Sequence, residues 1–81
     1  MKRYKAKDYE IRIWWSEEDD AFLAQVVDMP GLMTHGETPE DAARENYVAL
    51  ELALDCLRED GKTPPAPGSR RVHHASAAHA P

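Results

Sequence analysis

The sequence predicts a small α+β domain in which three antiparallel strands form a sheet and one amphipathic helix lies across a face of it. Three observations lead to this prediction: two segments that alternate apolar and polar residues, a Pro-Gly pair after the second, and a long stretch with helical spacing. The 81 residues allow one domain. A sheet covered by one helix is an economical two-layer arrangement that buries the apolar face of each.

The first two strands are predicted at residues 9–15 and 21–27, joined as a hairpin by the polar and acidic residues 16–20. Alternation places Trp15 in the core and Trp14 on the opposite face of the sheet. The residues expected to share the core face are Tyr9, Ile11, Ile13 and Trp15 in the first strand, with Phe22, Ala24 and Val26 in the second.

Residues 28–31, Asp-Met-Pro-Gly, predict a turn, and residues 32–36 predict a short third strand. The helix should begin after Thr38, which can cap the free N–H groups, and should end before Gly61. Cys56, within the helix, is interpreted as a small buried or half-buried apolar residue. The apolar residues at helical spacing are Ala43, Tyr47, Leu50, Leu54 and Leu57.

The segment after the helix is rich in proline at residues 63–67 and should be extended. Residues 68–81 are rich in alanine and histidine and show no core pattern, so we divide the chain into a domain at 1–67 and a tail at 68–81. A short fourth strand around residues 71–73 is an open alternative for part of this tail.

The charge distribution indicates the kind of partner. The net charge is −5, but residues 1–7 are basic, whereas residues 8–63 contain all fifteen carboxylates. Such an acidic body repels nucleic acid phosphates and favours a basic protein partner. No apolar run has the length of a membrane span, and the single cysteine excludes an internal disulfide. We therefore expect a soluble, cytoplasmic protein that does not bind DNA through its body.

The sheet face opposite the helix, which includes Trp14, lacks predicted cover, so we expect a homo-oligomer, a dimer or a tetramer. The candidate partner-binding residues are Trp14 and the run of carboxylates Glu17, Glu18, Asp19 and Asp20. The carboxylate run is interpreted as a solvated turn that can also contact a basic partner.

No catalytic, cofactor-binding or metal-binding residue is expected, and the chain is not predicted to be an enzyme. Glu10 and Asp28 have no third carboxylate to join them in a two-metal centre. Cys56 has no neighbouring base. The histidines His35, His73, His74 and His79 show no convergent ligand pattern.

The order of these segments resembles the HicB family of antitoxins. The matching segments are D-x-P-G at 28–31, the sequence GETPEDA at 36–42 that opens the helix, Asn46 in the helix interior, and Gly61 before the prolines. The resemblance covers residues 9–67. It implies a partial ribonuclease-H-like fold, homo-oligomerisation, and neutralisation of a small basic HicA-type toxin that cleaves mRNA.

Two departures from the family pattern stand out. Val27 occupies a position where a proline often precedes the turn, and fourteen residues follow the proline-rich stretch, which is too few for a helix-turn-helix. Operator DNA binding is therefore not expected of this short form. The alternative interpretation of the chain is an orphan homo-oligomeric binding or scaffold domain without a toxin partner.

Overall fold

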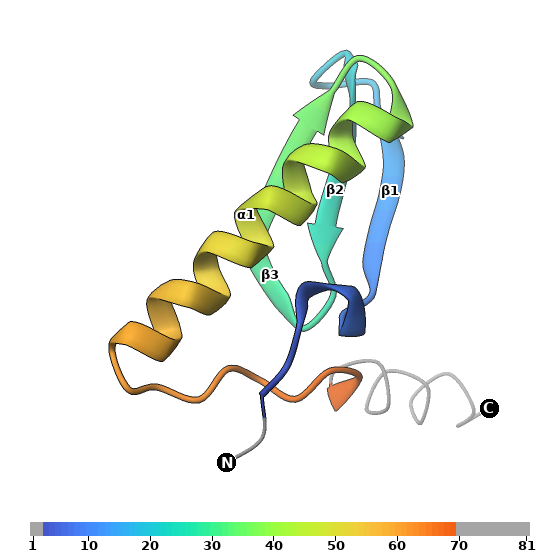
Figure 1. Ribbon diagram of the computed structural model, residues 1–81. Coiled ribbons are helices and arrows are strands. Elements are labelled where there is room, and N and C mark those ends of the chain that lie inside the picture. The colour runs from blue at the N-terminus through green and yellow to red at the C-terminus, as the bar shows by residue number, and fades with distance from the viewer. Residues whose placement is uncertain (1–2, 70–81) are drawn as a thin grey trace, which may run out of the picture.

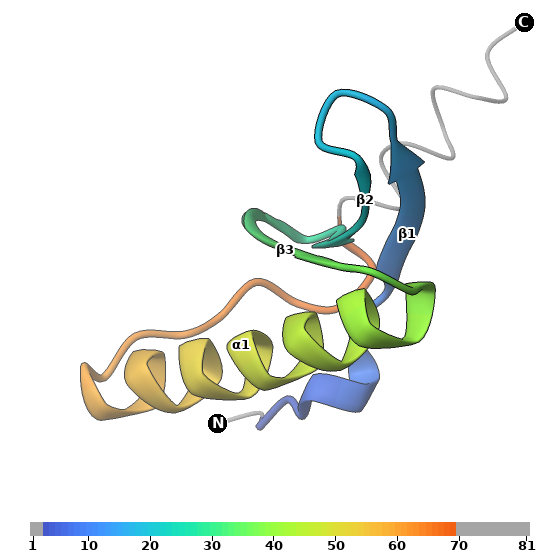
Figure 2. The same cartoon turned by 90° about the horizontal axis from the view of Figure 1, so that it is seen from above.

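The computed structural model describes residues 3–69, which form a three-stranded antiparallel sheet with one long helix across a face (Figure 1). The elements in chain order are a 3-10 helix η1 (Ala6–Asp8), β1 (Ile11–Ser16), β2 (Ala21–Val26), β3 (Met29–Gly36) and α1 (Pro39–Glu59). The strands lie in sequence order, β1-β2-β3, so β1 and β3 are the two edges. Seen from above, α1 lies on one side of the sheet (Figure 2). The predicted α+β fold is confirmed.

The predicted hairpin of the first two strands is confirmed. Ile11 lies opposite Val26 and Trp15 lies opposite Phe22, so the apolar positions of both strands share one face. At the turn, Asp20 adopts a φ of 51°, a left-handed conformation that aspartate tolerates better than most residues. Tyr9 is extended but precedes β1, because η1 comes directly before it.

The predicted turn at residues 28–31 is wrong. The chain reverses at Val27 and Asp28, and β3 already begins at Met29, so that Pro30 lies within a strand. The register shifts between Gln25 and Val26. A proline is tolerated there because β3 is an edge strand, where one side of the backbone needs no partner.

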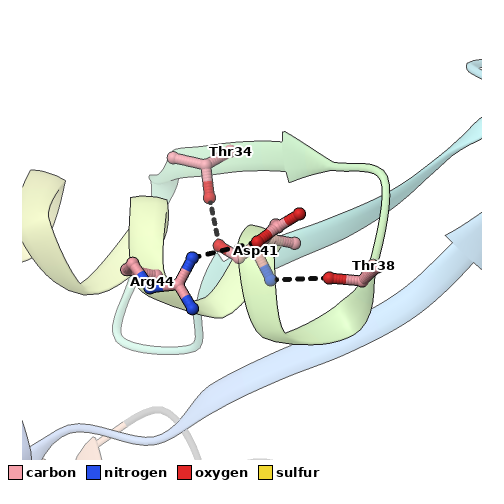
Figure 3. A network of polar contacts seen from close by, with 5 residues as sticks. Thr34, Thr38, Asp41 and Arg44 are labelled. Carbon is pink, nitrogen blue, oxygen red and sulfur yellow. Dashed lines mark hydrogen bonds and ion pairs between the residues drawn. The ribbon is translucent and has the colours of Figure 1, made fainter.

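The start of α1 is fixed by side chains in the way the sequence predicts (Figure 3). The hydroxyl oxygen of Thr38 accepts a hydrogen bond from the backbone N–H of Asp41 at 3.1 Å, and Pro39 occupies the first turn. Arg44 pairs with Asp41 at 2.9 Å, while the Thr34 hydroxyl donates to the Ala42 carbonyl at 2.9 Å. The last bond ties the helix to β3.

The end of α1 is also confirmed. Gly61 has a φ of +71°, and the N–H of Lys62 donates to the Leu57 carbonyl at 2.8 Å. A left-handed glycine followed by such a bond is a common way to satisfy the free carbonyl groups at the end of a helix.

The face that α1 turns toward the sheet is the predicted one at Leu50 and Leu54 but differs nearer the start of the helix. The buried helix residues are Ala42, Asn46, Leu50 and Leu54, whereas Tyr47 is exposed. Asn46 was not among the predicted core-facing positions, and its burial is possible because its amide nitrogen donates to two carbonyl groups of the sheet. Cys56 is exposed, so its interpretation as buried or half-buried is wrong.

The hydrophobic core lies at the end of the sheet near η1, where the N-terminal segment, the strands and α1 meet. Its buried members are Ala6, Tyr9, Val26, Leu50 and Leu54. Trp15 was expected in this core but is 46% exposed. The reason is that α1 packs mainly against β3 and β2 and touches β1 little. Trp15 packs instead against the edge of the Phe22 ring, with the ring centroids 5.0 Å apart.

The proline-rich stretch is not helical, as predicted, and it returns along the sheet. The Tyr9 hydroxyl donates to the Pro65 carbonyl at 2.7 Å, and the N–H of Gly68 donates to Asp28 at 2.8 Å. Ser69 makes a longer contact with the same carboxylate, at 3.4 Å. The proposed strand around 71–73 and the histidines His73, His74 and His79 lie outside the described residues.

Candidate partner-binding surface

The sheet face opposite α1, here called the open face, carries large apolar side chains that α1 does not cover. The register places Trp14 opposite Leu23 and Leu23 opposite His35, and it places Gln25 opposite Met33. Trp14 is 36% exposed and Met33 is 49% exposed. The prediction that Trp14 lies on the face away from the helix is therefore confirmed.

Trp14 is held in place by its neighbour Arg12 on the same face. The Arg12 guanidinium lies over the indole ring, 6.0 Å from its centroid. A cation in this position is attracted by the negative face of the ring. This contact limits the orientations of the indole at the outer strand of the open face.

The four carboxylates proposed from the sequence form the loop between β1 and β2, here called the acidic loop. Glu17, Glu18, Asp19 and Asp20 are all exposed. Asp19 shapes the loop, because its carboxylate accepts from the Ser16 hydroxyl at 2.8 Å while its N–H donates to the Ser16 oxygen at 3.2 Å. Between residues 3 and 69, Glu17, Glu18 and Asp20 have no ion-pair partner.

The acidic loop and the open face meet at a shallow hollow of about 370 Å³. It is lined by Asp19 of the acidic loop and by the apolar side chains of Leu23 and Met33. The remaining lining residues are Ala21, Thr34 and His35. An apolar floor with negative charge along one side is suited to a protein partner that presents an apolar side chain surrounded by cations.

A second apolar surface lies on α1 and was missed by the sequence prediction. Val48 and Leu52 are exposed one turn apart, and Leu52 has 61% of its surface accessible. Together with Tyr47 and Tyr4 they line a groove of about 550 Å³ between α1 and the N-terminal segment. The i, i+4 spacing of Val48 and Leu52 was the available signal, but these positions lie beside the core face.

The buried side chains of Tyr9 and Asp28 stabilise the fold. Burial raises the pKa of the Tyr9 phenol, and the negative charge of Asp28 raises it further. Because the Tyr9 hydroxyl is hydrogen-bonded to Pro65, and Asp28 accepts from Gly68, both groups fasten the C-terminal stretch to the sheet.

Over residues 3–69, no three His, Cys, Asp or Glu side chains are grouped so that they could hold a metal ion. In the same part of the chain, no helix combines the length and the apolar character needed to cross a bilayer.

A comparison of the chain with protein-family models, curated proteins and solved structures finds no match in any of the three.

Proposed function

We propose that this chain is an antitoxin of the HicB type, which binds and neutralises a small basic ribonuclease of the HicA type. The observation that carries the proposal is that Asp19 of the acidic loop lines the same hollow as Leu23 and Met33 of the open face. The sequence resemblance over residues 9–67 supplies the class of partner. In this proposal the chain is not itself an enzyme.

Inhibition would follow from the shape and charge of this surface. Trp14 and Met33 are exposed large side chains that can enter a pocket on a partner, as aromatic and methionine residues often do in interfaces. Glu17, Glu18 and Asp20 have no ion-pair partner within residues 3–69, so they can meet cations of a ribonuclease without losing an internal pair. A basic enzyme covered in this way cannot bind RNA phosphates.

The proposal predicts that a small basic ribonuclease is encoded beside this gene, and that ribonuclease, once produced, provides the test. Its RNA cleavage is measured with and without the chain, and the affinity of the complex is measured at several salt concentrations. We expect stoichiometric inhibition. The variant E17Q/E18Q/D20N should weaken binding by about tenfold and reduce its dependence on salt, because charges at an interface rim act mainly through long-range attraction.

The matched control is E45Q/E51Q/E59Q, which removes three exposed carboxylates from α1. It removes the same number of negative charges but leaves the acidic loop intact, so binding should change much less. Met33→Ala tests the open face separately from the charges and should also weaken binding. If the chain does not inhibit the ribonuclease, the proposal is wrong. Equal effects of the two triple variants would exclude the acidic loop as the contact.

The second candidate function is a self-associating scaffold without a toxin partner. It is favoured by one observation: among residues 3–69, no strand pairs with the outer edge of β1. The two candidates are distinguished by the ribonuclease assay, since a scaffold would leave RNA cleavage unchanged.

A further inference from the structure

Another hollow, here called the basic hollow, lies between the N-terminal segment and the chain that follows α1, at the end of the molecule away from the acidic loop (Figure 1). Its volume is about 300 Å³, at the lower end of the range for sites that bind small molecules. Arg3, Arg58 and Lys62 contribute positive charge to its lining, and Tyr4 and Pro64 contribute apolar groups. Among residues 3–69, no carboxylate belongs to this lining.

The three cations come from different parts of the chain. Arg3 precedes η1, Arg58 lies in the last turn of α1, and Lys62 follows the helix. Cations are common at the end of a helix because they stabilise its carbonyl groups, and this accounts for Arg58 and Lys62. It does not account for Arg3, which a segment distant in sequence brings to the same hollow. The convergence of the three charges is therefore a feature of the tertiary structure.

Two of these cations are available to a ligand. Within residues 3–69, Arg3 and Lys62 have no ion-pair partner, whereas Arg58 pairs with Asp55. An anion that binds Arg3 and Lys62 therefore breaks no ion pair in this part of the chain. A guanidinium group donates hydrogen bonds in a flat fork that matches a phosphate group, and an ammonium group adds a point charge.

The apolar walls of the basic hollow are held in position by Tyr9. The rings of Tyr9 and Tyr4 pack edge to face with their centroids 6.3 Å apart, and the Tyr9 hydroxyl donates to the Pro65 carbonyl at 2.7 Å. Tyr9 is itself buried in the core. The two walls are thus fixed relative to each other before any ligand arrives, and such preorganisation lowers the cost of binding.

The net charge of −5 does not oppose an anion at this place. Charges more than about 8–10 Å apart are largely screened at physiological ionic strength, so a bound anion interacts mainly with the nearest groups. Five of the seven cations between residues 3 and 69 line the basic hollow or the groove beside it along α1. The carboxylates Glu51 and Asp55 line that groove but not the hollow.

We propose that the basic hollow binds a nucleoside monophosphate group. The phosphate lies among Arg3, Arg58 and Lys62, because a doubly charged anion matches three cations better than a single carboxylate does. The base lies against Tyr4 and Pro64, since the flat face of any base can stack on an aromatic ring. The inference does not depend on the proposed function, because this hollow and the acidic loop are at opposite ends of the molecule (Figure 1).

Binding is measured by two-dimensional NMR on the full-length chain, with AMP, inorganic phosphate and adenosine as probes. AMP should shift the amide signals of Gly61, Lys62 and Thr63 until they saturate. It should bind more tightly than phosphate or adenosine, because each of these contains half of the recognised group. Absence of saturable shifts at these residues up to about 10 mM AMP would overturn the proposal. Phosphate that binds as tightly as AMP would overturn the contact with the base.

A pair of matched variants tests whether the basic hollow is the site. R3Q/K62Q removes the two cations without an ion-pair partner and should weaken AMP binding about tenfold, as expected for lost hydrogen bonds to a charged group. The control K5Q/K7Q removes the same number of positive charges from the adjoining groove, so binding should weaken less than about twofold. Circular dichroism confirms that both variants are folded. Equal weakening by the two variants would exclude the hollow as the site.

Short RNA strands distinguish the two sources of a nucleoside monophosphate group, a free nucleotide and the end of an RNA strand. An RNA trinucleotide with a terminal phosphate is compared with the same strand without it and with AMP. If the phosphorylated strand binds more tightly than AMP, the natural ligand is a strand end, and the reverse order indicates a free nucleotide. A strand without the terminal phosphate that binds as tightly as the phosphorylated one would contradict the proposal.

Discussion

The side-chain amide of Asn46 on α1 donates a hydrogen bond to the main-chain carbonyl oxygen of Ala24 in β2, at 3.1 Å. The same nitrogen donates to the Leu32 carbonyl of β3, also at 3.1 Å. Asn46 and Ala24 are fully buried. One residue of the helix thus connects β2 and β3 close to the shift in register between Gln25 and Val26.

Substitution of Asn46 should be among the most destabilising changes in the helix. Asn46→Ala removes both donors and leaves two buried carbonyl groups without this partner, so we expect a loss of about 2–3 kcal/mol in the free energy of unfolding. Urea unfolding monitored by circular dichroism measures it. Glu45→Ala, at the exposed neighbouring position, should change stability by less than about 0.5 kcal/mol. Similar losses for the two variants would contradict a special role for Asn46.

Gly36 should not accept a side chain. A Cβ atom there would lie 2.5 Å from the backbone nitrogen of Ala42 and 2.8 Å from the Asp41 Cβ, so the strand end and the helix start would have to separate. We expect Gly36→Ala to cost about 1–3 kcal/mol in thermal or urea unfolding. Gly31→Ala is the control, since a Cβ there meets no atom within 4 Å. Its effect should be close to zero, and equal effects at both positions would refute the close approach.

Tyr9 should make stability fall at alkaline pH. Because the pKa of its phenol is raised in the folded state, by burial first and then by Asp28, the unfolded state ionises first as the pH rises. The stabilisation that comes from the neutral Tyr9 phenol is complete below about pH 10, the ordinary pKa of tyrosine. It is lost as the pH rises through the folded-state pKa.

The variant Tyr9→Phe shows how much of the alkaline loss of stability comes from the Tyr9 phenol. It removes the hydrogen bond to Pro65, which should cost about 0.5–1.5 kcal/mol near neutral pH, and it should flatten the alkaline loss of stability. The measurement is the urea midpoint from pH 8 to 11. Tyr47→Phe, at an exposed tyrosine, should retain the alkaline loss. An unchanged pH profile in Tyr9→Phe would contradict the assignment.

Asp28 should control how firmly the C-terminal stretch is attached. Asp28→Ala removes the acceptor of the Gly68 N–H, so we expect a cost of about 1–3 kcal/mol and faster hydrogen exchange at the Gly68 amide. Asp55→Ala removes an exposed carboxylate that pairs with Arg58 and should cost little. Slow exchange at Gly68 in Asp28→Ala would show that other contacts hold this segment.

Local patterns in the sequence were sufficient for the order of the elements and for the ends of the helix. Thr38 and Gly61 act on the nearest few residues, so their roles could be predicted without a partner segment. The third strand was misplaced because Pro30 usually marks a turn. The edge position of β3, which makes that proline harmless, depends on the arrangement of the whole sheet.

The candidate surface was predicted in part. Alternation assigned Trp14 to the open face and the run of carboxylates to an exposed loop, because both follow from local geometry. That Asp19 borders the same hollow as Met33 could not be predicted, since these residues come from different strands. The exposed Val48 and Leu52 were missed because they lie beside the core-facing positions of the helix.

By itself the sequence determined the strand alternation, the helix limits and the opposite charges before and after β1, all of which are properties of neighbouring residues. The tertiary structure decided which apolar positions are covered. A helix that crosses the sheet obliquely buries Val26 and leaves Trp15 exposed on the same face. It also buries Asn46, because two strand carbonyls that are distant in sequence come within hydrogen-bond distance of its amide.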